Sequence, residues 1–217
     1  MIYDKLKKMA VVPVVEIEDS HQAVPVAEAL INAGLPVIEI TFRTDAALEA
    51  IKNIADQYPS FLIGAGTISS VQQVQEAVDA GATFIVTPGV NIPVLTYCRD
   101  MKIPVIPGVC TPSDIERLLG YDLPMLKFFP AEAAGGVAML KALAGPYGAI
   151  QFMPTGGISP ENLESYLSCG NVSVCGGSWI AAKGLIQKAD FEEIQKLGEK
   201  AVAQVSSIRA KGQSYAA

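Results

Sequence analysis

The chain has 217 residues and a mass of 22.9 kDa, and half of its residues are hydrophobic while only 18% are charged. This composition excludes a disordered chain and predicts one domain over residues 1–217 with a single large core. The net charge is −6 and the most basic segment is the short "KLKK" of residues 5–8, so we expect no nucleic-acid partner.

A helix is expected first, over residues 2–9, and eight β-rich runs then follow at intervals of 21 to 26 residues. The runs cover residues 11–17, 37–43, 61–67, 83–89, 104–109, 125–130, 149–157 and 172–178. The segments between them are typical of helices, for example residues 45–58, 69–81 and 159–170. Ser159-Pro160 and Thr111-Pro112 are expected to start helices, and a last helix is expected over residues 190–209, before a loose "GQSYAA" end.

Eight β-then-α units predict an α/β fold with parallel strands, closed into a (β/α)8 TIM barrel over residues 11–182. An open, doubly wound sheet is the alternative. That alternative is disfavoured because no G-x-G-x-x-G follows the first strand.

No run reaches the roughly 18 apolar residues of a membrane span, and the first residues lack a signal peptide's apolar centre. We therefore expect a cytoplasmic protein without a membrane partner. The cysteines follow no C-x-x-C spacing and predict reduced thiols without disulfides or metal: Cys98, Cys110, Cys169 and Cys175. The apolar composition also predicts that partner subunits cover part of the surface, as in a homo-oligomer.

Strand parity selects side chains for the barrel interior, whose mouth holds the active site in this fold. In "VIEITFR", Glu39, Thr41 and Arg43 share one parity, and the apolar residues between them suit packing against helices. In "MLKFFPAE", Lys127 shares its parity with Phe129 and is expected to point inward. Burial would favour the neutral, nucleophilic amine, but a plain ion pair with Glu39 explains a buried lysine equally well.

Glycine pairs end the seventh and eighth runs, where this fold often binds phosphate. Gly156, Gly157, Gly176 and Gly177 would let backbone N–H groups approach an anion, and Ser178 adds a hydroxyl. "GAGT" places Thr67 at the same mouth.

Other chemistries have little support. The only histidine, His21, is predicted to be a surface residue, which leaves no basis for a histidine-dependent nucleophile or metal site. Glu39 is the one convincing inward carboxylate, and Glu132 is predicted to be an acid at a helix start.

Seven motifs in order, between residues 11 and 182, resemble the 2-keto-3-deoxy-6-phosphogluconate (KDPG) aldolase family. They are "VIEITFRT", "GAGT", "TPG", "KFFPAE", "GPYG", "PTGGIS" and "GGSW". The resemblance implies a homotrimeric class I aldolase that uses no metal or other cofactor. Such an enzyme cleaves the phosphorylated 2-keto acid KDPG to pyruvate and glyceraldehyde 3-phosphate, and several relatives also cleave 4-hydroxy-2-oxoglutarate.

The same resemblance assigns residue roles. Lys127 matches the Schiff-base lysine and Glu39 the general acid/base. The remaining matches are expected to bind substrate: Arg43 and Thr67 at its carboxylate, Pro88 and Phe129 along the site, Thr155 near C4, and Gly156, Gly157 and Ser178 at the phosphate, with Gly176 beside them. Thr155 favours the gluconate-type substrate, because galactonate-specific relatives often carry an aliphatic residue there. Phe42, where an aliphatic residue is common, is interpreted as a packing change.

Two other functions remain open. The phosphate cradle is shared among TIM barrels, so a metal-independent phosphosugar isomerase or epimerase is one alternative. A non-catalytic phosphometabolite-binding protein, in which Lys127 and Glu39 form only a salt bridge, is the other.

Overall fold

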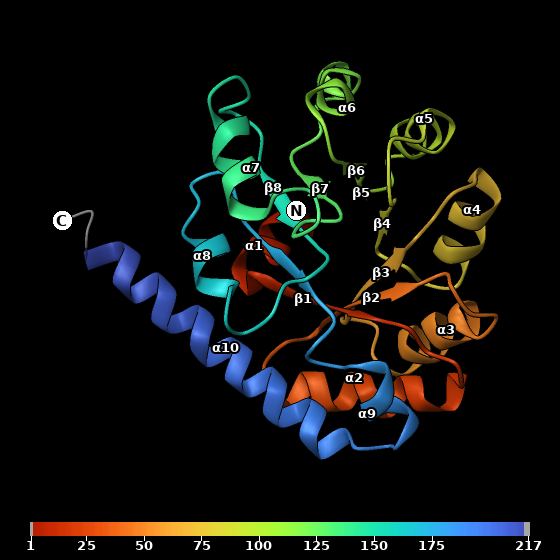
Figure 1. The fold of residues 1–217 in the computed structure, drawn as a ribbon. Helices are drawn as coiled ribbons and strands as arrows, with labels where there is room; N and C mark the ends of the chain where they lie inside the picture. Colours follow the sequence, from red (N-terminus) through yellow and green to blue (C-terminus); the bar gives the residue numbers. More distant parts are fainter. Residues whose placement is uncertain (1, 215–217) are drawn as a thin grey trace.

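A computed structural model describes residues 2–214, with side chains through residue 211. Parallel strands occupy the centre of the molecule and the helices lie around them (Figure 1). Within residues 2–214, no helix combines the length and the apolar character that crossing a bilayer requires. The end of the "GQSYAA" segment, residues 215–217, lies outside the described residues.

All eight predicted β-runs contain strands, and the fifth run contains two. The strands are β1 (Val11–Val15), β2 (Val37–Thr41), β3 (Leu62–Gly66), β4 (Phe84–Val86), β5 (Val105–Ile106), β6 (Gly108–Val109), β7 (Leu126–Phe128), β8 (Phe152–Pro154) and β9 (Cys175–Gly177). Pro107 separates β5 from β6, because proline has no N–H to donate to a sheet.

Helices fill the intervals between strands. They are α1 (Ile2–Met9), α2 (Ala23–Asn32), α3 (Ala47–Gln57), α4 (Val71–Asp79), α5 (Ile92–Asp100), α6 (Pro112–Glu116), α7 (Gly136–Ala144), α8 (Leu163–Leu167), α9 (Lys183–Gln187) and α10 (Phe191–Ser214). Two 3-10 helices complete the set, η1 (Ser20–Gln22) and η2 (Leu119–Tyr121).

Two predicted helix boundaries were wrong, the start of α8 and the end of α10. The helix near residue 160 begins at Leu163 rather than Pro160, because the Asn162 side chain accepts a hydrogen bond from the N–H of Ser159 and holds these residues in a turn. The last helix continues through Ser214, into the segment expected to be loose. The start at Thr111 is confirmed, where Thr111 and Asp114 form a reciprocal capping box.

The strands form two parallel sheets. The larger is curled and has the order β5-β4-β3-β2-β1-β9, so that β1 pairs with both β2 and β9. The smaller has the order β6-β7-β8. Isolated parallel bridges join Phe152 to Val172 and Thr155 to Gly176, and so connect the β8 segment to the segment that contains β9.

Both faces of the curled sheet are buried, which explains why its strands are almost continuously apolar. On β2, Ile38 and Ile40 are fully buried on one face while Glu39 and Thr41 are buried on the other. The alternation of side chains predicted from the sequence therefore holds along β2. Phe42 is partly buried against the core, consistent with a packing role.

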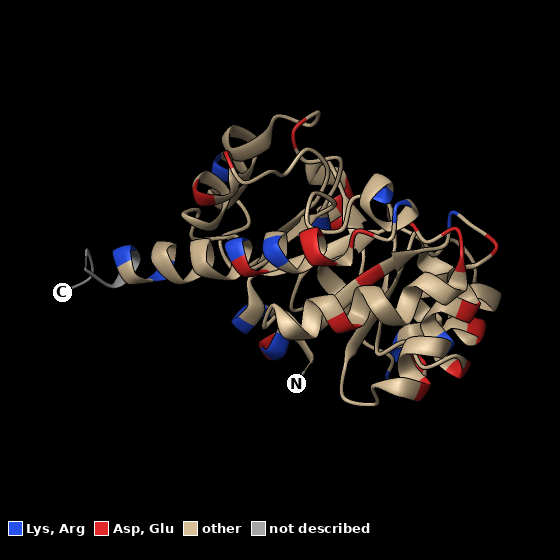
Figure 2. Cartoon of the chain, turned by 90° about the horizontal axis from the view of Figure 1, so that it is seen from below, with Lys and Arg blue, Asp and Glu red and all other residues tan. Residues whose placement is uncertain are grey.

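The two terminal helices meet outside the sheet. Arg209 of α10 donates to the backbone carbonyl of Lys8 at 2.7 Å and also to that of Lys7, which satisfies carbonyls at the end of α1. Both acidic and basic residues lie along α10 (Figure 2), with two glutamates in its first turn and Lys211 in its last.

Candidate active site

Lys127 on β7 and Glu39 on β2 meet inside the molecule. The Lys127 Nζ lies 3.0 Å from Glu39 Oε1, and the side chains are 6% and 0% exposed. The structure thus confirms that Lys127 points inward. A contact of this length suits both a buried ion pair and direct proton transfer, so further features are needed to separate the two.

The second oxygen of Glu39, Oε2, is buried and has no hydrogen-bond partner among the described residues, and the same is true of Thr155 Oγ1. A buried polar atom without a partner costs stability, typically about 1–3 kcal/mol. A bound water or a polar group of a ligand would complete the hydrogen bonding of both atoms.

Glycine at position 66 makes room for the Glu39 carboxylate. A Cβ built on Gly66 would lie 2.3 Å from Glu39 Oε1, which is closer than any real contact. Gly66 ends β3, directly opposite Thr41 in the parallel register. This requirement was not predicted; the small residues of "GAGT" were the only signal.

Phe129 lies beside Lys127, and Thr67 lies next to Gly66 in the chain. The Lys127 Nζ lies 5.2 Å from the centroid of the Phe129 ring, a distance typical of cation–π contacts. Thr67 directly follows Gly66 and has φ of 62°, in the left-handed region that β-branched residues rarely adopt. Strain of this kind concentrates at functional sites.

Arg43 lies in a turn beyond the end of β2, because the strand stops at Thr41 rather than at residue 43. Its position therefore does not follow from strand parity. Arg43 is exposed and lines a cavity of about 260 Å³ together with Thr41 and Ser178. The structure thus brings the predicted carboxylate-binding residue and a predicted phosphate-binding residue to one cavity.

The same cavity is bordered by an ion-pair cluster that sequence reasoning missed. Lys183 lies 2.6 Å from Glu16 and 2.7 Å from Glu18. Hydrogen bonds to these carboxylates raise the pKa of Lys183 to about 12. Nothing in the sequence pairs residues so far apart in the chain.

The glycine pairs have different structural reasons. Gly156 and Gly157, after β8, have φ of 100° and 81°, as a tight backbone cradle requires. Gly176 and Gly177 are buried, and the space of a Cβ would be taken by Thr155 Oγ1 and by the Trp179 ring. Side-chain packing therefore explains why both positions of the second pair are glycine.

Pro88 and Ser178 lie at the strand ends where they were expected, whereas the position of Glu132 differs from the prediction. Pro88 follows β4 and Ser178 follows β9, both exposed. Glu132 is not in the first turn of a helix, because α7 begins only at Gly136. Its carboxylate instead accepts a hydrogen bond from the Tyr166 hydroxyl.

The described histidine, cysteine and acidic residues do not form a second candidate site. His21 is exposed, as expected. All four cysteines are free, and burial raises the pKa of Cys98 to about 11, which makes its thiol unreactive. Among residues 2–214, no cluster of three His, Cys, Asp or Glu side chains could hold a metal ion.

The profile of the family described as KDPG and KHG aldolase matches residues 2–197. The chain is 45% identical to the 2-dehydro-3-deoxy-phosphogluconate aldolase of Haemophilus influenzae, over 90% of this chain and 92% of that one. It is 43% identical to the KHG/KDPG aldolase of Escherichia coli, over 88% and 90%.

A KDPG aldolase structure from Legionella pneumophila, with pyruvate captured as a covalent carbinolamine intermediate, superposes with a TM-score of 0.86. That protein is 40% identical to this chain, and the match covers 88% of this chain and 93% of that one.

Proposed function

The chain belongs to the KDPG and KHG aldolase family, and from this we propose that it cleaves 2-keto-3-deoxy-6-phosphogluconate to pyruvate and glyceraldehyde 3-phosphate through a Schiff base on Lys127. The observation that carries the proposal is the buried contact between Lys127 and Glu39, in which one carboxylate oxygen is left without a partner. A nucleophile with a proton-transfer group in hydrogen-bond reach is the arrangement that covalent catalysis needs.

In the first stage, the neutral amine of Lys127 attacks C2 of the keto acid, and Glu39 has taken up the lysine proton along their 3.0 Å hydrogen bond. A proton passes from the attached nitrogen to the C2 oxygen and gives the hydroxyl of the carbinolamine. Glu39 then protonates this hydroxyl, so that water leaves and a protonated imine remains. The positive imine draws electrons toward C2 far better than the original carbonyl does.

In the second stage, the ionised Glu39 accepts the proton of the C4 hydroxyl. The C4 oxygen becomes the aldehyde of glyceraldehyde 3-phosphate, the C3–C4 bond breaks, and its electron pair enters the enamine on C2 and C3. Protonation of C3 and addition of water to the imine then release pyruvate and free Lys127.

We assign substrate binding to residues at the same ends of the strands. The forked guanidinium of Arg43 suits the substrate carboxylate, with Thr67 beside it. Thr155 offers its unpartnered hydroxyl to the C4 region. The phosphate is assigned to Gly156, Gly157, Gly176 and Ser178, and the walls of the site to Pro88 and Phe129.

We also propose 4-hydroxy-2-oxoglutarate as a substrate. The matching family profile and the Escherichia coli relative both carry KHG in their names, which stands for 2-keto-4-hydroxyglutarate, another name of the same compound. The first stage of the reaction needs only the 2-keto acid end, which both compounds share.

We further infer that the two sheets close into one eight-unit barrel in a single domain. The β8 to β9 bridges and the pairing of β9 with β1 support closure on one side. On the other side, only Pro107 interrupts the run from β5 into β6.

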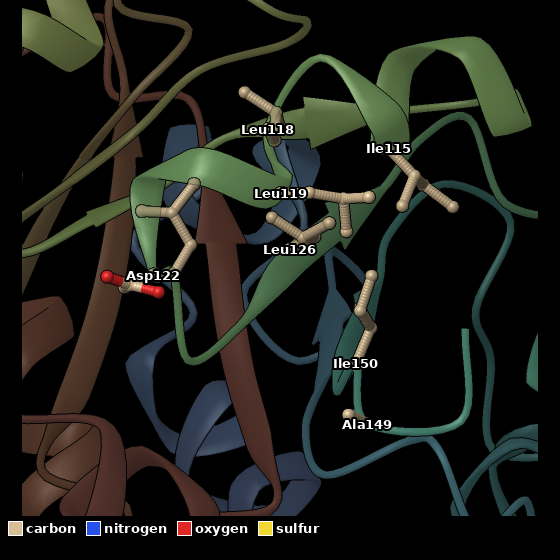
Figure 3. Close-up of a pocket in the computed structure, with 8 residues that line it drawn as sticks. Ile115, Leu118, Leu119, Asp122, Leu126, Ala149 and Ile150 are labelled. Carbon is tan, nitrogen blue, oxygen red and sulfur yellow. The ribbon is translucent and has the colours of Figure 1, made fainter.

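A homotrimer is proposed as the assembly, formed through the apolar surface between α5 and β8. Met101 and Leu119 are 58% and 56% exposed there, and Arg99 lies 5.5 Å from the Tyr121 ring, which brings the end of α5 to η2. Figure 3 shows the adjoining cavity, of about 190 Å³, with Ile115, Leu126 and Ile150 among the side chains around it.

Four free thiols support a reducing compartment, the cytoplasm.

The proposal is tested by the Glu39→Gln variant. Pyruvate release from KDPG should fall by about 10² or more, because proton transfer supplies that range of rate enhancement. A matched control is Glu199→Gln on the exposed face of α10, which should leave turnover unchanged. Equal turnover in the Glu39 variant and the wild type would remove Glu39 from the mechanism.

A further inference from the structure

Three polar side chains outside the proposed catalytic set hold the loop at residues 155–159 from behind. The backbone N–H of Glu132 donates to the carbonyl of Gly156 at 3.0 Å. The stem of Glu132 packs directly on Gly157, since a Cβ on that glycine would lie 2.5 Å from Glu132 Cγ. Its carboxylate is in turn fixed by the hydroxyl of Tyr166, whose ring is fully buried.

Asn162 holds the other half of the loop. Its Nδ2 donates to the carbonyl of Gly157 at 2.9 Å, and its Oδ1 accepts from the N–H of Ser159 at 2.9 Å. Asn162 directly precedes α8, which also carries Tyr166. The loop is therefore attached to α8 through two separate contacts.

These contacts leave one side of the loop open. The carbonyls of Gly156 and Gly157 are both occupied by donors. The parallel bridge between Thr155 and Gly176 directs the Gly156 N–H toward the Gly176 carbonyl. Within the described residues, no hydrogen bond from the Gly157 N–H is found. A backbone N–H in a turn of this kind can contribute to a concavity that binds anions.

Tyr166 is suited to a fixed donor. Burial, and then the neighbouring Glu132 carboxylate, raise the pKa of the Tyr166 hydroxyl above its ordinary value. The hydroxyl accordingly keeps its proton at any pH at which the protein works.

We propose that Glu132, Tyr166 and Asn162 are positioning residues that hold the turn at Gly156 and Gly157 and aim the Gly157 N–H at the substrate phosphate. We assign none of the three a contact with the substrate. The proposal rests on the proposed function for the identity of the substrate. In this arrangement, the affinity of the protein for the substrate phosphate depends on the Glu132–Tyr166 hydrogen bond and on the two hydrogen bonds of Asn162.

The test compares a phosphate-dependent readout with a phosphate-free one. Tyr166→Phe, Glu132→Ala and Asn162→Ala should each raise KM for KDPG by about tenfold, a change in the range of one lost hydrogen bond to a charged group. Affinity for inorganic phosphate, measured by titration calorimetry, should fall in parallel. The rate of borohydride trapping with pyruvate, which carries no phosphate, should stay within about twofold of the wild type.

Glu132→Gln provides the rescue control, because its amide oxygen can still accept the Tyr166 hydrogen bond while the charge is removed. It should restore most of the phosphate affinity lost in Glu132→Ala. A merely structural role would lower the trapping rate and the melting temperature together with phosphate affinity, and that result would overturn the proposal. So would unchanged phosphate affinity in all three variants.

Failure of the aldolase assignment is recognised separately. In that case the wild type itself would form no pyruvate adduct, while calorimetry with inorganic phosphate would still report on the loop.

Discussion

The position of the Glu39 side chain depends on Gly66, a neighbouring residue that has no side chain. The carboxylate occupies space that a methyl group on Gly66 would fill. Lys127 and Glu39 come from strands 88 positions apart in sequence, and strand parity predicted that both point inward. Parity could not reveal the need for Gly66, since that depends on how closely β2 and β3 approach.

The Gly66→Ala variant should therefore lose activity without losing its fold. The added methyl displaces Glu39 from Lys127, and we expect turnover on KDPG to fall by at least about tenfold, as misplaced catalytic groups do. Circular dichroism and the rate of pyruvate release measure the two effects. Gly184→Ala is the control, because no atom lies within 4 Å of its new methyl group. Full activity in the Gly66 variant would show that the carboxylate position is not critical.

At the scale of elements, local rules predicted a helix start correctly where both capping partners lie within one turn, and failed where a tertiary contact intervenes. Thr111 and Asp114 form the expected capping box because both partners lie within one turn. The Ser159-Pro160 start failed because Asn162 directs its hydrogen bonds into the glycine loop, a tertiary arrangement that Ser-Pro does not signal. Arg43 was placed by the parity of a strand that ends two residues earlier.

The capping box gives a prediction about stability and pH. Burial alone would raise the pKa of Asp114, but hydrogen bonds from the backbone of Cys110 and Thr111 and from the Thr111 hydroxyl hold it below its ordinary value. A lowered folded-state pKa means that the carboxylate stabilises the fold above its unfolded-state pKa. That contribution disappears as the pH falls through the folded-state pKa.

Asp114→Ala should accordingly lower the free energy of unfolding by about 1 kcal/mol at pH 7, the usual worth of a cap. The difference from the wild type should shrink as the pH approaches 3. Urea titrations of both proteins across this range provide the measurement. A difference that stays constant with pH would assign the loss to helix propensity rather than to the ionised cap.

At the scale of the whole molecule, the repeating period predicted eight β-runs, each of which contains at least one strand. The ion pairs of Lys183 with Glu16 and Glu18 were beyond prediction, because they join segments about 165 residues apart through tertiary packing. The association expected from the apolar composition stays a prediction, and the exposed Met101 and Leu119 mark the surface where we propose it.

The proposed trimer should sediment at three times the 22.9 kDa of one chain. Leu119→Lys would place a charge on the apolar surface, and we expect it to shift the protein toward the monomer, because burying an unpaired ammonium is costly. Leu48→Lys, at an exposed leucine on α3, is the matched control. A trimer that tolerates the Leu119 change would move the interface elsewhere.

Covalent capture of pyruvate tests the central claim, that Lys127 is a nucleophile rather than half of a salt bridge. Protein incubated with pyruvate and sodium borohydride, with EDTA present, should gain one pyruvate-derived mass on the peptide that contains Lys127. The Lys127→Met variant should gain none. A wild-type protein that stays unmodified and fully active on a phosphosugar would contradict this account and favour a metal-independent isomerase. Phosphometabolite binding without an adduct or turnover would instead leave Lys127 and Glu39 as a structural ion pair.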